Sequence, residues 1–261
     1  MRQGSSRTSS PIRRKKKTFY PVNLDLEGRA VLVIGGGKVA ERKIESLIAC
    51  GANVRLVSPE GTARIRAWAG KGAIRWAPRP YRPGRDERGA FLVIAATDDA
   101  RVNRAACRAA KAARTFINVV DVPELCTCTI PAVVRRGDLQ IAVSTGGASP
   151  AFSRRVREEL EKTFGQGHER YLDLLGRLRA PLRKMVKDPA SRQDLMTRLA
   201  RLPVPRLLDR GQPARAAQNV LDVLARFLPP AETAAIARKI VNPALAQPRR
   251  QSKPAPSTRK P

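Results

Sequence analysis

The stretch VLVIGGGKVAERK, residues 31–43, joins an apolar run to a charged segment through three consecutive glycines. The apolar half is rich in valine and isoleucine and ends at glycine, as a buried parallel strand does. From residue 38 to 50 the apolar side chains recur at helical spacing, and Gly51 suits the position just past a helix end. The apolar run NVRLVSP comes next. This order predicts one βαβ unit over residues 31–57.

Within this unit, Gly35, Gly37 and Ala40 occupy the three positions of a GxGxxG/A motif. In a dinucleotide-binding fold the first glycine permits a tight turn and the second lets the backbone approach a pyrophosphate. The third small residue allows helix and strand to pack closely. Free N–H groups at the helix start would then face the phosphates. A turn that merely needs glycine is the alternative, but the order of the elements favours a nucleotide.

The end of the second strand is where such a fold binds the ribose hydroxyls, through an acidic side chain about 20 residues past the glycines. Glu60 lies near that place and Ser58 stands at the strand end, while Arg55 and Arg64 are close. The acidic residue favours NAD, and the nearby arginines leave NADP open.

Further strands alternate with helices along the next part of the chain. The apolar runs FLVIAAT (91–97) and TFINVV (115–120) are expected to be strands, and helices are expected over 63–68 and 97–113. Residues 72–90 are rich in Pro, Gly and Arg, which indicates an irregular connection. Strands that alternate with helices predict a doubly wound parallel sheet.

The pattern changes after Asp121. CTCTIPAVVRRGDLQIAVST alternates loosely and contains RGD as a turn, which predicts a β-hairpin. A helix is expected to begin at Ser149, which is followed by proline, and to end at Gly165. From His168 to about Ile240 the sequence has a helical period interrupted by prolines.

We therefore predict an α/β fold: an NAD-binding Rossmann domain with a parallel sheet, then a small β segment, then a C-terminal helical region. The expected divisions are a basic disordered arm (1–18), the Rossmann domain (19–121), the β segment with its following helix (122–164), a helical domain (165–240) and a basic, proline-rich disordered tail (241–261).

The formal net charge is +29, and the excess of Lys and Arg extends over the body of the chain as well as its two ends. Such a charge indicates an anionic partner, either nucleic acid or a small polycarboxylate or phosphate. The run RRKKK at 13–17 could bind nucleic acid or could simply keep an arm solvated. Aromatic residues make up only 4% and are not interleaved with the basic ones, so this pattern does not support nucleic-acid recognition by stacking.

The four cysteines, at positions 50, 107, 126 and 128, form no CxxC pair, and His168 is the one histidine of the sequence. A structural zinc site is therefore not expected, and we predict no metal ligands. Cys126 and Cys128 are expected to be small strand residues, and His168 a solvated side chain in the helix-breaking segment GQGHER. Reduced thiols suit a cytoplasmic protein, and no apolar run approaches the roughly 20 residues of a membrane span.

Two segments carry candidate chemistry. Asp121 follows the fourth strand, where open parallel sheets bind ligands, so it could be a general base or a metal ligand; a turn or N-cap aspartate is equally compatible. STGGASP (144–150) brings two glycines and several hydroxyls to a helix start, which suits an anion. The alternative for that segment is a hairpin exit with an ordinary capped helix.

These blocks, in this order, resemble the family of bifunctional precorrin-2 dehydrogenases / sirohydrochlorin ferrochelatases, which also forms the N-terminal half of sirohaem synthases. The matching blocks are YPVNLDLEGRAVLVIGGGKVAERK, ANVRLVSPE, LVIAATDDARVN, NVVDVPELC and IPAVVRRGDLQIAVSTGGASPAFSRRVREELE. They extend from residue 20 to about 165. Several blocks that match in order are far more specific than one glycine motif.

The resemblance implies that NAD oxidises precorrin-2, a reduced tetrapyrrole with eight carboxylates, to sirohydrochlorin. In some members insertion of ferrous iron follows and gives sirohaem. It also implies that Asp121 removes a proton and that residues 122–164 form a homodimer and line the substrate cleft. The implied cofactor contacts are Gly35, Gly36, Gly37, Lys38, Val39, Pro59, Glu60, Thr97 and Asp98. The candidate substrate-binding residues are Asn118, Ser144, Thr145, Gly146, Gly147 and Ser149.

The sequence departs from the family at two positions. Cys128 stands where members often carry a bulky apolar residue, and Thr145 where some fused members carry a phosphorylatable serine. We expect no methyltransferase domain after the helical region, so uroporphyrinogen methylation would come from another protein.

The competing class is a non-catalytic, redox-sensing Rossmann protein whose basic arms bind nucleic acid in a salt-sensitive manner. A tetrapyrrole cleft would use both NVVD and STGGASP, whereas a sensor needs no such pair.

Overall fold

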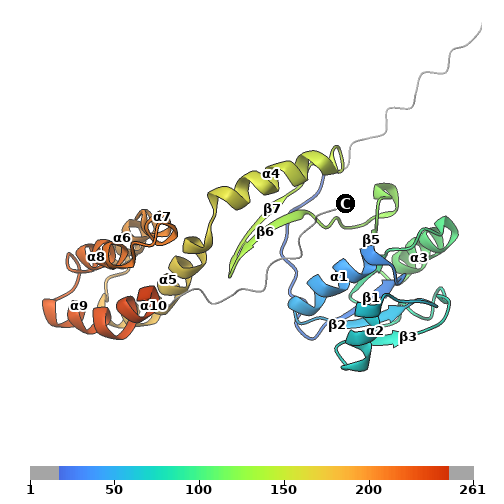
Figure 1. Cartoon of the computed structure of the whole chain (residues 1–261), viewed down its shortest axis with the longest axis horizontal. Coiled ribbons are helices and arrows are strands. Elements are labelled where there is room, and N and C mark those ends of the chain that lie inside the picture. Colours follow the sequence, from blue (N-terminus) through green and yellow to red (C-terminus); the bar gives the residue numbers. More distant parts are fainter. Residues whose placement is uncertain (1–17, 247–261) are drawn as a thin grey trace, which may run out of the picture. The chain divides into compact units, whose positions relative to one another are not determined.

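The computed structural model describes residues 18–246 and separates into two units (Figure 1). The first unit contains the residues up to Ile130 together with Gly146–Ala148. The second contains Pro131–Thr145 and the residues from Ser149 onward. Each unit encloses its own apolar core, so each has side chains of its own that stabilise it.

A five-stranded sheet forms the centre of the first unit. Its strands are β1 (Ala30–Ile34), β2 (Asn53–Val57), β3 (Arg75–Ala77), β4 (Leu92–Ala95) and β5 (Phe116–Val119). The spatial order is β3-β2-β1-β4-β5, and every neighbouring pair is parallel. This is a Rossmann order, in which the sequence of strands reverses between β1 and β4 and leaves a crevice at that switch point.

Three helices cover the two faces of this sheet: α1 (Lys38–Ala49), α2 (Ala63–Gly70) and α3 (Ala100–Ala112). Successive β1 side chains alternate between the faces, so that Val33 packs with Ile44 of α1 and Ile34 lies in the cluster of Ala106 from α3. Burial on both faces explains why the strands are continuous apolar runs. Each fully buried Val, Leu or Ile contributes about 1.5–3 kcal/mol. The predicted doubly wound α/β fold is confirmed.

The region 72–90 was expected to be irregular throughout, and this was wrong for β3. That strand is three residues long and lies at the edge of the sheet, where the indole Nε1 of Trp76 donates to the carbonyl of Ser58 at 3.0 Å. A short edge strand of mixed polarity leaves little periodic signal in the sequence. Beyond it the chain is irregular and is held by a bidentate pair of Arg79 with Asp86, at 2.7 and 2.9 Å.

The predicted hairpin is confirmed in the second unit. Strands β6 (Ala132–Arg136) and β7 (Leu139–Val143) pair antiparallel through a turn at Gly137. Helix α4 (Pro150–Thr163) follows, with Ser149 as its N-cap: the hydroxyl accepts a hydrogen bond from the N–H of Phe152 at 3.2 Å. The guanidinium of Arg136 donates to carbonyls at the end of α4, which ties the hairpin to the helix.

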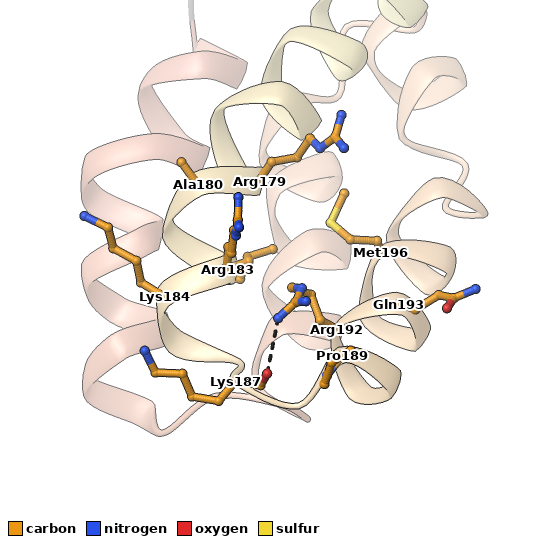
Figure 2. A pocket seen from close by; sticks show the side chains of 10 residues that line it. Arg179, Ala180, Arg183, Lys184, Lys187, Pro189, Arg192, Gln193 and Met196 are labelled. Atoms are coloured by element: carbon orange, nitrogen blue, oxygen red, sulfur yellow. Dashed lines mark hydrogen bonds between the residues drawn. The ribbon is translucent and has the colours of Figure 1, made fainter.

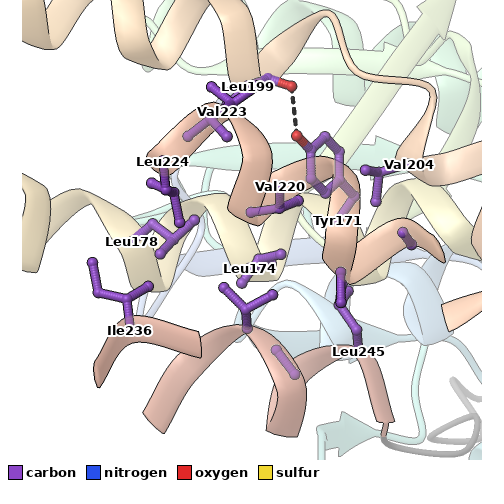
Figure 3. Close-up of a cluster of buried hydrophobic side chains, with 14 of the residues drawn as sticks. Tyr171, Leu174, Leu178, Leu199, Val204, Val220, Val223, Leu224, Ile236 and Leu245 are labelled. Atoms are coloured by element: carbon purple, nitrogen blue, oxygen red, sulfur yellow. Dashed lines mark hydrogen bonds between the residues drawn. The ribbon is translucent and has the colours of Figure 1, made fainter. Parts of the chain in front are cut away.

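The rest of the second unit is helical, as predicted. Its elements are α5 (Gln166–Met185), α6 (Pro189–Ala200), α7 (Val204–Asp209), α8 (Pro213–Leu224), α9 (Pro230–Ile236), the π-helical turn η2 (Ala237–Val241) and α10 (Asn242–Ala246). Their apolar faces meet around Leu174, Leu178 and Val220, and the hydroxyl of Tyr171 donates to the carbonyl of Leu199 (Figure 3). The helical region therefore extends to Ala246, past the expected boundary at Ile240.

The segment GQGHER separates two helices, as expected: α4 ends at Thr163, Gly165 is the N-cap of α5, and the residues from Gln166 form the first turn of α5. A Cβ at Gly167 would lie 2.1 Å from the carbonyl oxygen of Pro205, so this glycine is required for close packing of α5 against α7. His168 is half-buried instead of solvated, and its ring packs on Phe164 with centroids 5.0 Å apart.

The basic arm and most of the basic tail predicted from the sequence, residues 1–17 and 247–261, lie outside the described residues. Between residues 18 and 246 no helix is both long and apolar enough to cross a membrane.

Candidate active site

The loop between β1 and α1 uses its three glycines in different ways. Gly35 has a φ of +101°, and a Cβ there would lie 2.2 Å from the carbonyl oxygen of Ala96. A Cβ on Gly36 would lie 1.9 Å from the carbonyl oxygen of Glu60. Around Gly37, by contrast, a Cβ would meet no atom within 4 Å. Backbone packing therefore requires glycine at the first two positions, whereas the third glycine leaves open space at the start of α1.

That open space lies at the N-terminus of α1. Gly37 is the N-cap residue and offers no side chain to the free N–H groups of the first turn, while the N–H of Glu41 already bonds to the Gly37 carbonyl. The unpaired N–H groups and the positive end of the helix dipole favour an anion. Lys38 is exposed beside them, with Nζ 3.7 Å from a carboxylate oxygen of Glu41.

A pocket of about 400 Å³ joins this helix start to the ends of β4 and β5. Six predicted site residues line it: Gly37, Lys38, Val39, Thr97, Asp98 and Asp121. The pocket lies outside the carboxyl ends of β1, β4 and β5, at the switch point where open α/β sheets bind ligands. The structure therefore brings the glycine loop and Asp121 to one pocket.

The pocket also includes residues that the sequence reasoning did not select. Asn103 of α3 is buried, and its Nδ2 donates to the carbonyl of Thr97 at 2.9 Å. Its Oδ1 has no hydrogen-bond partner among residues 18–246, so it can accept a bond from a ligand. The available signal was a polar side chain on the apolar face of an amphipathic helix. Asp99 has a different role: it caps α3, and its bonds to two backbone N–H groups lower its pKa.

Asp121 adopts a left-handed backbone conformation, with φ of +61°. Few residues other than glycine adopt it, and aspartate is one of the more tolerant ones. The side chain is exposed and caps no helix, because the N-cap of the following 3-10 turn η1 (Pro123–Leu125) is Val122. Asp121 also interacts with the charge of Lys43 on α1. Burial lowers the pKa of Lys43, and the negative charge of Asp121 raises it.

The loop after Asp121 is attached to β5 through Cys126. The buried Sγ of Cys126 accepts from the N–H of Val119 and lies against the carbonyl of the same residue, each at 3.2 Å. The hydroxyl of Thr127 accepts from the N–H of Ile117 at 2.9 Å. Cys126 and Cys128 thus lie in a loop, and their expected place in a strand was wrong. Burial, with a contribution from Cys126, raises the pKa of Cys128 to about 11, so its thiol stays protonated near neutral pH.

Asn118, predicted to bind substrate, is buried under this loop. Its Nδ2 donates to the carbonyl of Cys128 at 3.2 Å. Its side chain therefore supports the loop that follows Asp121 and does not line the pocket.

The STGGASP segment satisfies most of its hydroxyls internally. The hydroxyl of Thr145 accepts from the N–H of Ser149 at 3.1 Å and lies 3.2 Å from its carbonyl, while Ser149 caps α4. Gly146 and Gly147 turn the chain with positive φ angles of 63° and 88°. These bonds are those of a hairpin exit with a capped helix. Binding of an anion at Ser144, Thr145, Gly146, Gly147 or Ser149 stays a prediction.

Pro59 and Glu60 follow β2 and are exposed. The two arginines that left NADP open in the sequence are engaged elsewhere. Arg55 donates to the carbonyls of Asp86 and Arg88, at 3.3 and 2.9 Å. Arg64 pairs with Glu45, and its guanidinium lies 4.8 Å from the ring centroid of Trp68.

No group of three or more His, Cys, Asp and Glu side chains within residues 18–246 is arranged to hold a metal ion.

Comparison with known proteins gives several relatives. The chain is 39% identical over 219 residues to a sirohaem synthase of Xylella fastidiosa (strain M12), covering 84% of this chain and 46% of that relative. It is 35% identical over 207 residues to a sirohaem synthase of Pseudomonas paraeruginosa, covering 79% and 44%. It thus spans about half the length of the curated relatives it matches. Among solved structures, "SirC, precorrin-2 dehydrogenase" superposes with a TM-score of 0.67 at 27% identity, covering 79% of this chain and all of that one.

The Rossmann sheet, the glycine loop and the pocket at the switch point define the class of dinucleotide-binding proteins. The family model described as "Putative NAD(P)-binding" matches residues 22–132, and the model "Sirohaem biosynthesis protein central" matches residues 136–163. In sequence and in fold the chain is thus similar to precorrin-2 dehydrogenases and to sirohaem synthases.

Proposed function

We propose that this protein oxidises precorrin-2 to sirohydrochlorin, with NAD as the hydride acceptor, in the biosynthesis of sirohaem. The names of its relatives and the full coverage of a precorrin-2 dehydrogenase support this reaction. The observation that carries the proposal is the single pocket that contains both the start of α1 and Asp121. Oxidation removes a hydride and a proton from the macrocycle, and the two sides of this pocket suit those two tasks.

The cofactor side of the pocket is the start of α1. The backbone N–H groups of Lys38 and Val39, in the first turn of α1, would bind the pyrophosphate, and the open space at Gly37 supports this. Glu60 is the exposed acid past β2 that would bind the ribose hydroxyls. Because Arg55 and Arg64 are bonded elsewhere, neither is free to pair with a 2′-phosphate, which favours NAD over NADP. NAD, when bound, supplies the hydride acceptor.

The substrate side of the pocket is Asp121. An exposed carboxylate held in a turn after β5 can accept the proton that leaves the macrocycle. Val120, Val122 and Leu125 line the pocket next to Asp121, and their apolar surface suits the body of a tetrapyrrole. The general base in this proposal is therefore Asp121.

An optical assay tests the reaction. The full chain is mixed with precorrin-2 prepared under anaerobic conditions, and NADH formation is followed at its absorption band with NAD or with NADP. We expect turnover that needs the protein and is faster with NAD. Absence of NADH formation by a chain that binds NAD would contradict the proposed oxidation, and preference for NADP would contradict the role of Glu60.

We propose insertion of ferrous iron into sirohydrochlorin as a second activity, since the curated relatives are named sirohaem synthases. Asp121 is again the candidate group, because insertion releases protons from the macrocycle and an exposed carboxylate can accept them. Iron here is a substrate. The test is iron insertion into sirohydrochlorin without NAD, and a rate equal to the spontaneous one would leave a dehydrogenase alone.

We further propose a homodimer in the cytoplasm. No disulfide joins the four cysteines within residues 18–246, which suits a reducing compartment. Phe152 and Ile130 are exposed apolar side chains that a partner subunit could cover. Light scattering on the purified chain measures the mass. The competing redox sensor predicts DNA binding that is lost at high salt and on removal of the two basic arms, residues 1–18 and 241–261.

A further inference from the structure

The helical unit contains a large groove between α5 and α6. Its volume is about 1000 Å³, and its lining residues are all different from those of the Asp121 pocket. Five of them are cationic and none is acidic: Arg179, Arg183, Lys184, Lys187 and Arg192. Figure 2 shows Arg179, Arg183, Arg192 and Met196 around the space between the two helices, with Lys184 and Lys187 extending outward at its side.

These cations differ from their neighbours in having no carboxylate partner. On the same two helices, Arg177 pairs with Asp173 at 2.8 Å and Arg198 pairs with Asp194 at 2.9 Å. None of the five groove cations forms an ion pair within residues 18–246. The two acids nearest to Arg192 in sequence are both engaged elsewhere: Asp194 pairs with Arg198, and Asp188 is the N-cap of α6. No carboxylate of residues 18–246 therefore neutralises the five cations that line the groove.

Arg192 is held in place before any ligand arrives. Its Nη1 donates to the carbonyls of Val186 and Lys187, at 2.9 and 3.3 Å, where α5 ends. Nε and Nη2 of Arg192 make no hydrogen bond within residues 18–246 and can donate to an anion. A guanidinium fixed in this way loses little conformational freedom when it binds a carboxylate.

The groove also has apolar surface. Leu182 is fully buried beneath it, and Ala180, Pro189 and Met196 contribute further apolar atoms. No aromatic side chain lines it, so it lacks the stacking surface that single-stranded nucleic acids use. Apolar surface beside three arginines suits a ligand with an apolar body and several carboxylates at its edge, in a volume typical of small-molecule sites.

We propose that the α5–α6 groove binds a tetrapyrrole polycarboxylate, as a second site for the class of molecule that the proposed function acts on. This assignment rests on the proposed function for the identity of the ligand. The chemistry alone, arginine forks beside apolar surface, identifies a polycarboxylate.

The experiment titrates the full chain with an oxidised octacarboxylate porphyrin, which NAD cannot oxidise, and follows its visible absorption. The groove variant carries Arg179→Gln, Arg183→Gln and Lys184→Gln. The control variant carries Arg210→Gln, Arg215→Gln and Arg226→Gln, which are exposed on the same unit, outside the groove, and remove the same charge. Circular dichroism checks that both fold.

We expect the groove variant to weaken porphyrin binding by about 10-fold or more, and to lower the number of porphyrins bound per chain, because charged hydrogen bonds are lost. The control variant should change the affinity for the porphyrin by less than about 3-fold. It loses only long-range attraction between exposed charges and the ligand, which salt largely screens. Equal weakening in the two variants would overturn the proposal, since net charge would then explain the binding.

Two further measurements separate the ligand classes. Met196→Gln should weaken binding of the porphyrin and leave binding of a small linear tricarboxylate unchanged, because only the macrocycle contacts the apolar surface. An oligonucleotide that displaces the porphyrin and binds more tightly would overturn the proposal in favour of nucleic acid. Porphyrin binding is independent of NADH formation, so a chain that fails to oxidise precorrin-2 but binds porphyrin in the groove would contradict the proposed function alone.

Discussion

The sulfur of Cys126 lies 3.2 Å from both the backbone nitrogen and the carbonyl oxygen of Val119. Val119 ends β5 and Cys126 follows η1, so this contact closes the loop that contains Asp121. A small, buried thiol suits the task because it can both accept and donate a weak hydrogen bond in an apolar setting. The position of the candidate base therefore depends on a residue that takes no part in chemistry.

Replacing this thiol should disturb the loop. We expect Cys126→Ala to lower the free energy of unfolding by about 1–3 kcal/mol, because a buried N–H loses its partner. The same change should lower kcat for precorrin-2 oxidation more than it raises KM for NAD, since the glycine loop is untouched. Denaturant unfolding and steady-state kinetics measure the two effects. Cys50→Ala, at the end of α1, is the control, and an equal loss of kcat there would exclude a specific role for Cys126.

Asp121 itself is tested by Asp121→Asn. Asparagine tolerates the left-handed conformation, so the fold should keep its stability. The side chain can no longer accept a proton, and we expect kcat to fall by about 10²–10⁴-fold. NAD affinity, measured by calorimetry, should stay within about twofold of the original. A variant that keeps full turnover would remove Asp121 from the mechanism.

The glycine loop allows stability and binding to be separated. Gly36→Ala puts a Cβ 1.9 Å from the Glu60 carbonyl, so we expect a loss of more than about 2 kcal/mol of stability together with loss of NAD binding. Gly37 has a φ of −78° and open space around it, so we expect Gly37→Ala to have the same midpoint of denaturant unfolding as the original chain. The new methyl group would still occupy the place of the pyrophosphate, so we expect the affinity for NAD to fall by about 10-fold. Normal NAD affinity in Gly37→Ala would argue against a pyrophosphate there.

Acid should weaken the loop that follows β3. The Arg79 guanidinium beside Asp86 holds the pKa of that carboxyl below its usual value of 3.8. A lowered folded-state pKa means that the stabilisation is complete above the unfolded pKa and is lost as the pH falls through the folded one. We expect Asp86→Asn to cost about 1–2 kcal/mol at pH 7, and the difference from the original chain to shrink below about pH 4. Denaturant titrations at pH 7, 5 and 3 measure it. A difference that stays constant with pH would exclude the ion pair as its source.

Much of the site was accessible from local patterns. Gly37 and Asp121 each follow a strand, and parallel strands bring their carboxyl ends together, so the sequence predicts that these residues lie close to each other. Thr97 and Asp98, which line the same pocket, were proposed from the family resemblance. Asn103 and Cys126 were missed because their importance depends on what lies opposite them in space. Asn118 was placed on the substrate side, yet its side chain bonds to Cys128 beneath the loop.

The amino-acid sequence by itself determined the alternation of strands and helices, the hairpin, the cap at Ser149 and the glycine loop, because periodicity, capping and glycine geometry are local properties. Tertiary structure alone decided the rest. Three features each depend on backbone far away in the chain: the edge strand β3, the close packing of α5 at Gly167, and the need for glycine at position 36. The same is true of Arg55, whose bonds to the loop after β3 decide that it does not face the ribose. Such contacts between distant segments leave no period in the sequence, and they set the specificity of the site.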